Sequence, residues 1–330
     1  MKFKKFKKIL LIFLLSFIIM PTSTLAYSDY VYAGGDNIGI ELRSKGVMII
    51  GTYKVKDGYP AKEAGLKSGD MITAINDKTV TSITDMVNII HENEENDHVE
   101  ITYIRGLEKM KTNLKIKKED SVYKTGLYVK DSITGIGTLS FIDPNTKRFG
   151  ALGHEITEKT TGKILEIKDG KIFDSSVTDI VRSENGSPGE KNAKFYSDQV
   201  NGVVFANTEE GIFGDYTNTI SDKKLYQVAT PDEIKLGKAQ MLTVLEGEQV
   251  ESCEIEILKI GDSTEKNKNV LFEVTDPKLL EKSGGVVAGM SGSPIIQNDK
   301  IVAAVTHVVV DNPKRGYGIF ITNMLEESEK

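Results

Sequence analysis

The chain contains the stretch Gly289-Met290-Ser291-Gly292-Ser293-Pro294-Ile295-Ile296, a serine in a glycine-rich turn that leads into an apolar run. A nucleophilic serine needs donors that hold the negative charge developing on the attacked carbonyl. Glycine lets the backbone turn sharply, so that the N–H groups of Gly289 and Ser291 can face one point. The stretch predicts a loop before a β-strand, with Ser291 as nucleophile and with Gly289 and Ser291 as oxyanion hole. Ser293 is predicted to be structural.

A general base for this serine is available upstream. The chain has four histidines, and His154 and His307 lie in the same half as Ser291. His154 follows the small-residue turn of residues 150–153 and precedes the serine, so it is the candidate base. His307 lies in an apolar run and is typical of a half-buried strand histidine, although its position would also suit a residue beside a substrate pocket.

Two aspartates compete for the role of the acid that orients the histidine. Asp276 ends an apolar run shortly before Ser291, and Asp198 follows His154. Such an acid must be ionised and partly buried to hold the imidazole tautomer. The serine loop resembles that of chymotrypsin-like proteases, with Met290 where many members carry aspartate. In those enzymes the acid follows the histidine at a spacing that, taken alone, favours Asp198.

Residues 119–330 carry many short β-type runs separated by glycine and asparagine turns. This spacing is typical of β-barrels. We therefore predict a mainly β chain whose second domain, residues 119–330, is a chymotrypsin-like double β-barrel.

The first half has a different pattern, with strands around one amphipathic helix that begins after Thr81 and Ser82. Residues 60–76 (PAKEAGLKSGDMITAIN) resemble the core signature of PDZ domains in exported bacterial proteases. We predict a PDZ-like α+β domain at residues 34–118. Ile38, Gly39 and Ile40 resemble the loop that binds a peptide C-terminus as the peptide adds a strand to the sheet edge, although Gly39 could equally begin a strand.

The N-terminus and the composition restrict location and partners. Residues 1–26 combine five lysines, an apolar run and a small-residue end, which predicts a signal peptide or a retained membrane anchor. The net charge of −6 argues against a nucleic-acid partner. Cys253 is the sole cysteine, and no metal-ligand or phosphate-loop motif is present, so no cofactor or metal is expected.

Together these motifs resemble the stage IV sporulation protein B (SpoIVB) peptidases of endospore-forming bacteria. The resemblance rests on residues 135–141, 149–155, 276–280, 284–298 and 304–308. It implies a catalytic triad of His154, Asp276 and Ser291, which places Asp276 ahead of Asp198. It also implies export to the forespore intermembrane space, self-cleavage near the N-terminus, and cleavage of a membrane-bound regulator of an intramembrane metalloprotease that activates a late mother-cell sigma factor.

Two other functions fit parts of the sequence. A non-catalytic PDZ scaffold protein would have lost the catalytic residues, yet His154, Asp276 and Ser291 are all present. A general exported quality-control protease shares both kinds of domain, but it usually carries the protease domain before the PDZ domain, which is the reverse of the order here.

Overall fold

The computed structural model describes residues 27–56, 58–93, 95–119, 122–158, 162–220, 223–261 and 266–330. The predicted leader at residues 1–26 lies outside this range. Within the described residues, no helix is long and apolar enough to cross a membrane.

Strands dominate the described chain. They are β1 (Tyr30–Ala33), β2 (Asn37–Thr52), β3 (Met71–Ile75), β4 (Lys78–Thr79), β5 (His98–Arg105), β6 (Glu108–Lys115), β7 (Lys117–Glu119), β8 (Val122–Lys124), β9 (Leu127–Ile142), β10 (Arg148–Ala151), β11 (Ile167–Val181), β12 (Glu190–Thr208), β13 (Gly211–Tyr216), β14 (Leu225–Val228), β15 (Gly237–Val244), β16 (Val250–Ile260), β17 (Val270–Val274), β18 (Pro294–Gln297), β19 (Lys300–Val308) and β20 (Arg315–Phe320). The helices are α2 (Pro60–Glu63), α3 (Ile83–Glu92), the 3-10 helix η1 (Pro231–Glu233), α4 (Pro277–Ser283) and α5 (Ile321–Ser328).

Six of these strands close a first antiparallel barrel. The pairing runs β9–β2–β11–β12–β13–β10 and returns to β9. Its interior is apolar, with Ile40, Leu42 and Phe149 fully or almost fully buried. This barrel includes residues 37–44, which lie inside the segment predicted as PDZ-like (residues 34–118), so the first residues of that segment belong to the barrel.

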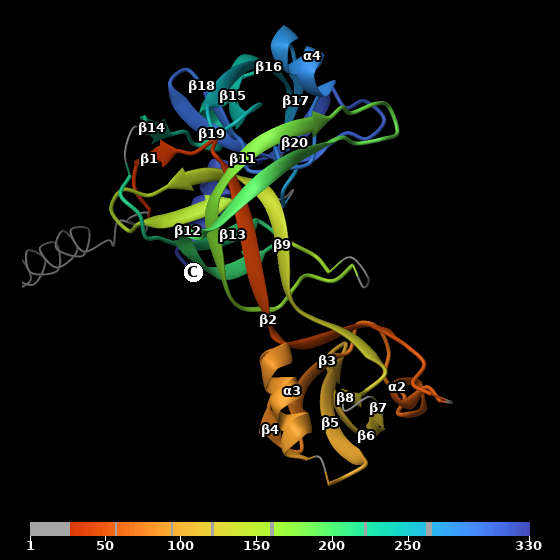
Figure 1. Cartoon of the computed structure of the whole chain (residues 1–330). Coiled ribbons are helices and arrows are strands. Elements are labelled where there is room, and N and C mark those ends of the chain that lie inside the picture. The colour runs from red at the N-terminus through yellow and green to blue at the C-terminus, as the bar shows by residue number, and fades with distance from the viewer. Residues whose placement is uncertain are drawn as a thin grey trace, which may run out of the picture.

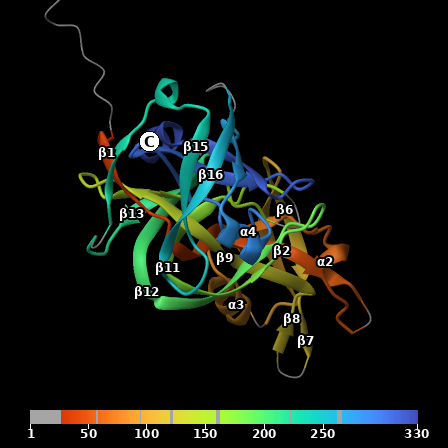
Figure 2. The same cartoon turned by 90° about the horizontal axis from the view of Figure 1, so that it is seen from above.

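A second barrel follows in the chain, with the pairing β15–β16–β17–β20–β19–β18 and back to β15. Figure 2 shows β15, β16 and α4 from above. In β16, the buried Cys253, Ile255 and Ile257 alternate with the exposed Glu254 and Glu256, as a strand with one face on a core requires. The predicted mainly β fold with two barrels is confirmed.

The two barrels are joined by β1, β14 and α5. β1 pairs with β9 of the first barrel and with β14, which in turn pairs in parallel with β19 of the second. Val31, Phe141, Ile301 and Met324 are buried together at this junction. The junction holds the barrels in contact through side chains from both.

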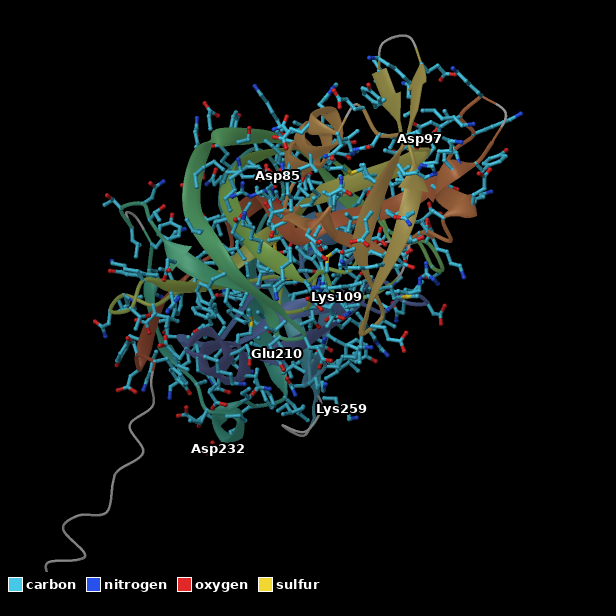
Figure 3. All side chains as sticks on the ribbon, turned by 90° about the horizontal axis from the view of Figure 1, so that it is seen from below. Asp85, Asp97, Lys109, Glu210, Asp232 and Lys259 are labelled. Carbon is cyan, nitrogen blue, oxygen red and sulfur yellow. The ribbon has the colours of Figure 1, made fainter. Side chains whose placement is uncertain are left out.

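The PDZ-like module lies beyond one end of the barrels, between β2 and β9 (Figure 1). It contains α2, β3–β6 and α3, together with the ends of β2 and β9 nearest to it. The predicted helix is confirmed as α3: the Ser82 side chain accepts a hydrogen bond from the N–H of Asp85, and Met86, Ile89 and Ile90 face the core. Figure 3 labels Asp85 on this helix.

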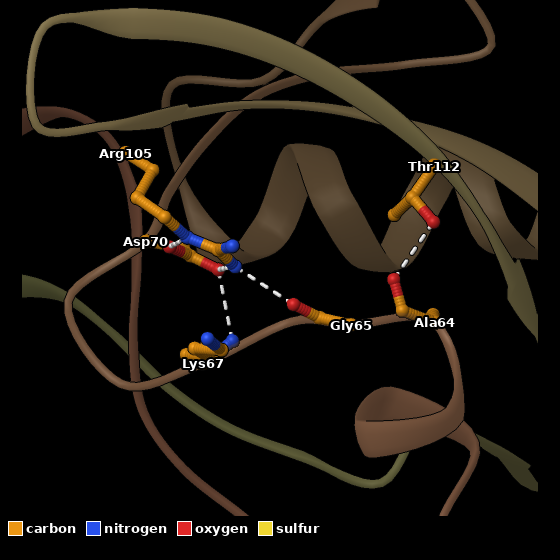
Figure 4. Close-up of polar contacts among 6 residues, drawn as sticks. All are labelled: Ala64, Gly65, Lys67, Asp70, Arg105 and Thr112. Carbon is orange, nitrogen blue, oxygen red and sulfur yellow. Dashed lines mark hydrogen bonds and ion pairs between the residues drawn. The ribbon is translucent and has the colours of Figure 1, made fainter.

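A buried ion pair holds the signature segment of the module (Figure 4). Asp70 is 1% exposed, and its carboxylate receives Nε and Nη2 of Arg105 at 2.7 and 2.6 Å and the N–H of Lys67 at 2.8 Å. Arg105 also donates to the carbonyl of Gly65 at 2.7 Å. Charge-assisted, bidentate bonding of this kind satisfies a buried carboxylate, so the Gly-Asp of the signature fixes a turn.

Candidate active site

The nucleophile loop lies between α4 and β18, and glycines set its path. Gly289 and Gly292 have φ angles of +93° and +94°, which L side chains rarely adopt. A Cβ on Gly292 would lie 2.0 Å from the carbonyl oxygen of Thr138. The loop can therefore pack against β9 only if position 292 is glycine.

Thr138 of β9 holds this loop in place. Its N–H donates to the carbonyl of Ser291 at 2.9 Å, and its Oγ1 donates to the carbonyl of Gly289 at 2.8 Å. The N–H groups of Gly289 and Ser291 donate to no acceptor in the described part of the chain. Both predicted oxyanion donors thus lack a partner within the described structure, as an oxyanion hole requires. Sequence reasoning missed Thr138, because nothing near it in the chain indicates that it meets Ser291.

Ser291 is half-buried, and its Oγ donates to the carbonyl of Thr306 at 2.9 Å. The N–H of Gly292 donates to the carbonyl of Val305, the residue before Thr306 on β19, at 2.7 Å. β19 therefore forms one wall of the site. A rotation about χ1 of Ser291 would release its hydroxyl from Thr306 for proton transfer to a base.

His154 follows β10 in a tight turn, where Leu152 and Gly153 both have positive φ angles, of +69° and +71°. Nδ1 of His154 lies 2.7 Å from the carbonyl oxygen of Glu155. Because a carbonyl only accepts, this bond places the imidazole proton on Nδ1 and leaves Nε2 free to act as a base.

The loops of His154 and Ser291 converge between the barrels. The N–H of Leu152 donates to the carbonyl of Thr138 at 3.3 Å, and a Cβ on Gly153 would lie 2.9 Å from the Thr306 methyl group. The histidine loop of the first barrel therefore packs on the same residues, Thr138 and Thr306, that hold Ser291 of the second.

His307 lies beside these two residues. Its ring centroid is 5.2 Å from that of His154, and its Nδ1 is buried with no hydrogen-bond partner in the described residues. Burial, followed by the nearby His154 and Lys268, lowers the pKa of His307 to about 4. Its imidazole is therefore neutral near pH 7. The structure places it as a half-buried strand residue next to the candidate base.

Neither candidate acid bonds to His154 within the described residues. Asp276 caps α4: its carboxylate accepts from the N–H of Leu279 at 2.9 Å and from that of Glu254 at 3.2 Å. Asp198 is exposed on β12. The role of Asp276 as the orienting acid stays a prediction.

The structure corrects the assignment of the peptide-binding loop to Ile38, Gly39 and Ile40. These residues lie inside β2, where one edge pairs with residues 135–137 of β9 and the other with residues 172–174 of β11. Ile38 and Ile40 are 2% and 1% exposed. A peptide cannot add to an edge that already has a strand, so this segment is part of the barrel wall.

Lys191 is a residue that the sequence did not single out. It is buried behind the nucleophile loop, where its side chain packs on Gly289 and its N–H donates to the carbonyl of Ala288 at 2.9 Å. Its Nζ donates to Oγ1 of Thr243 at 3.0 Å, and burial lowers the pKa of the amine to about 7. The residues around Lys191 in the chain are polar, so the sequence carries no sign of this burial.

In the parts of the chain that the structure describes, no group of three or more His, Cys, Asp or Glu side chains is arranged to hold a metal ion.

Comparisons with known proteins find the same two kinds of domain in this chain. The family model "SpoIVB peptidase S55" matches residues 121–325, and a PDZ-domain model matches residues 37–117. The serine protease Do-like HtrA of Lactococcus lactis subsp. cremoris is 41% identical over 73 residues, which is 22% of this chain and 18% of that protein. A protein of Thermotoga maritima named as a zinc metalloprotease is 29% identical over 270 residues, 72% of this chain and 48% of its own length.

Among solved structures, the PDZ domain of the SdrC-like protein from Listeria monocytogenes is similar, with 26% identity and a TM-score of 0.23. The match covers 26% of this chain and 87% of that one. The chain spans between about a fifth and about half of the length of the two relatives above.

The double barrel, the serine loop and the family match define a PDZ-containing serine peptidase. Because the family model covers well over half of the residues, the chain belongs to the SpoIVB peptidase S55 family.

Proposed function

We propose that this protein is an exported serine endopeptidase of sporulation, which cleaves itself and a membrane-bound regulator. Cleavage of the regulator releases an intramembrane metalloprotease that activates a late mother-cell sigma factor. The proposal is supported by membership of the SpoIVB peptidase family and by the lysine-rich, apolar leader of residues 1–26.

The observation that carries the peptidase function is the meeting of the His154 and Ser291 loops beside two N–H groups that have no acceptor among the described residues. In the proposed reaction, Oγ of Ser291 attacks the scissile carbonyl as its proton passes to Nε2 of His154. The N–H groups of Gly289 and Ser291 receive the oxyanion. The proton then goes to the leaving amine, and water, deprotonated by His154, releases the acyl group.

Mass spectrometry of the purified full chain tests the peptidase activity and the fate of the leader together. We expect wild-type protein to have lost an N-terminal segment that the Ser291→Ala protein keeps, because self-cleavage near the N-terminus requires the nucleophile. Ser293→Ala is the matched control: Ser293 is fully buried in the same loop, and its Oγ lies 3.5 Å from Oγ1 of Thr138. Identical N-termini in wild type and Ser291→Ala would contradict self-cleavage.

The sporulation role has its own test in an endospore-forming host. We expect a strain that carries only Ser291→Ala to complete engulfment of the forespore but to lack transcription dependent on the late mother-cell sigma factor. Normal transcription in that strain, with the protein present at wild-type level, would contradict the signalling role while leaving peptidase activity unaffected.

A further inference from the structure

The hairpin formed by β11 and β12 extends beyond the first barrel. β11 pairs with β2 only as far as Asp174, and β12 pairs with β13 only from Gly202 onward. Between these points the two strands pair mainly with each other, and we call this part of the hairpin the arm (residues 175–201). Val177 and Ile180 of the arm are buried in the core of the second barrel, and Figure 1 shows the hairpin reaching over that barrel. The arm therefore connects the first barrel to the barrel that carries the nucleophile.

The turn of the arm holds the segment that leads into the nucleophile loop. The N–H of Ser183 donates to the carbonyl of Ser283 at 2.8 Å, and its Oγ donates to the carbonyl of Val286 at 2.9 Å. The N–H of Ala288 in turn donates to the carbonyl of Gly189 at 2.8 Å. Residues of the arm therefore fix the backbone immediately before the loop.

Lys191 fixes the orientation of the peptide group between Ala288 and Gly289. Its N–H donates to the carbonyl of Ala288 at 2.9 Å. In a trans peptide the C=O and the following N–H point in opposite directions, so this bond aims the N–H of Gly289 away from the arm. That N–H is a predicted oxyanion donor and has no acceptor among the described residues. Gly289 alone would not set this direction, because glycine adopts positive and negative φ angles about equally readily.

The side chain of Lys191 is anchored at its far end on the second barrel. Its Nζ donates to Oγ1 of Thr243, a fully buried residue of β15, at 3.0 Å. Between the backbone and the amine, Cβ, Cγ and Cδ of Lys191 lie 3.2 to 3.4 Å from the position that a Cβ on Gly289 would take. The hydrocarbon stem of Lys191 therefore lies against Gly289 and is fixed at both ends.

The buried amine of Lys191 lowers the stability of the fold, which indicates a role other than packing. Lys191 is 3% exposed, and within the described residues its Nζ has one hydrogen-bond acceptor and no carboxylate partner. Burying an amine with one hydrogen bond is unfavourable compared with burying an apolar side chain of similar length. Residues that are locally unfavourable in this way are expected at functional sites.

We propose that Lys191 is a positioning residue of the oxyanion hole. Its N–H holds the peptide group that ends in Gly289, and its side chain, anchored on Thr243, prevents that peptide group from turning over. A reversed peptide group would present a carbonyl oxygen to the site and repel the oxyanion. This inference rests on the proposed roles of Ser291 and of the Gly289 N–H. The arm of the first barrel thereby completes the catalytic loop of the second.

The reaction of the full-length protein with p-nitrophenyl acetate tests this role, because a serine acyl-enzyme releases p-nitrophenol in a burst without the natural substrate. Ser291→Ala gives the background rate. In Lys191→Met, which keeps the length of the stem, we expect the acylation rate constant to fall about tenfold, less than the roughly 10²–10³-fold effect of removing a whole oxyanion donor. The dissociation constant of the ester should stay within about twofold, because an oxyanion hole acts on the transition state.

Lys194→Met is the matched control, since Lys194 is an exposed lysine on the same strand. We expect its acylation rate to stay within about twofold of wild type. The Tm of Lys191→Met should be no lower than that of wild type, because the buried amine is gone, whereas loss of a merely structural residue would lower the Tm together with the rate. An unchanged acylation rate in Lys191→Met, or a reduced rate with a lower Tm, would overturn the proposal.

Thr243→Val tests the anchor, since it removes the acceptor of Nζ at similar side-chain size. We expect it to lower the acylation rate about threefold or more in otherwise wild-type protein and to have no effect in Lys191→Met, because Thr243 acts through the amine. An equal effect in both backgrounds would overturn the anchoring by Thr243. Absence of a burst in wild-type protein, with no labelling of Ser291 by diisopropyl fluorophosphate, would instead overturn the peptidase function and with it the role of Lys191. A wild-type burst that Lys191→Met leaves unchanged would overturn the role of Lys191 alone.

Discussion

The nucleophile loop and the PDZ-like module were both recognised from short motifs, yet only the loop places its predicted residues where the motif implies. In the loop, Gly289, Ser291 and Gly292 are neighbours in the chain, so local backbone geometry alone sets their arrangement. In the module, the predicted binding segment around Gly39 depends on which strands lie beside it, and those strands come from residues 135–137 and 172–174. A motif that works through local geometry can be read from sequence, whereas one that works through an open edge cannot.

The largest expected effect concerns the nucleophile. Ser291→Ala should lower peptide hydrolysis by on the order of 10⁶-fold, because the variant cannot form the acyl-enzyme. Ser293→Ala should retain substantial activity, since the side chain of Ser293 is fully buried. Steady-state rates on a cleaved peptide, with circular dichroism to verify folding, provide the measurement. A comparable loss in both variants would mean that the local motif had been misread.

The next effect concerns the orienting acid, which depends on distant parts of the chain as the PDZ edge does. Asp276→Asn should reduce turnover more than Asp198→Asn does, by up to about 10⁴-fold if Asp276 orients His154 during catalysis. Asparagine also caps helices well, so α4 should remain folded. A loss below about tenfold in folded Asp276→Asn protein would show that this carboxylate serves only as the cap of α4.

Much of the fold followed from sequence for a physical reason. The local order of residues predicts the alternating burial of strands such as β16, and it predicts the capped, amphipathic helix α3. The local sequence does not predict that β2 continues through Gly46, because Ser44, Lys45 and Gly46 have the composition of a turn. Arg43 and Ser44 at the start of this stretch pair with β9 and β11, and Val47 and Met48 after it pair with β3, so long-range pairing on both sides overrides the local preference.

The sequence predicted only those residues of the site whose positions depend on local structure. His154 and Ser291 stood out because each lies in a glycine-rich turn of recognisable pattern. Thr138, His307 and Lys191 acquire their positions only when the two barrels meet. Nothing local predicts that Thr138 bonds to Gly289 or that Lys191 packs behind it.

Gly39 tests whether its segment belongs to the barrel or to a peptide site. A Cβ there would lie 2.1 Å from a ring carbon of Phe173, which is 1% exposed. Gly39→Val should therefore lower the free energy of unfolding by about 3 kcal/mol. Gly135→Val is the matched control, since position 135 of β9 pairs with Ile40 but has open space for a Cβ. Equal stability of the two variants in urea unfolding would indicate that Gly39 lies in an accessible loop and not in the barrel wall.

The last expected effect is a pH dependence of stability at Lys191, behind the nucleophile loop. Its pKa is lowered from the ordinary 10.5 to about 7 in the folded protein, so between these values the unfolded chain binds a proton that the folded chain does not. The free energy of unfolding contributed by this residue therefore rises with pH across that window, and the penalty for its burial is complete below pH 7. Lys191→Met removes the penalty, so its gain in Tm over wild type should be largest near pH 6 and should shrink towards pH 10. Lys194→Met, at an exposed position on the same strand, should show a difference that does not vary with pH. A constant gain for Lys191→Met across that range would mean that the amine is not held in a buried, neutral state.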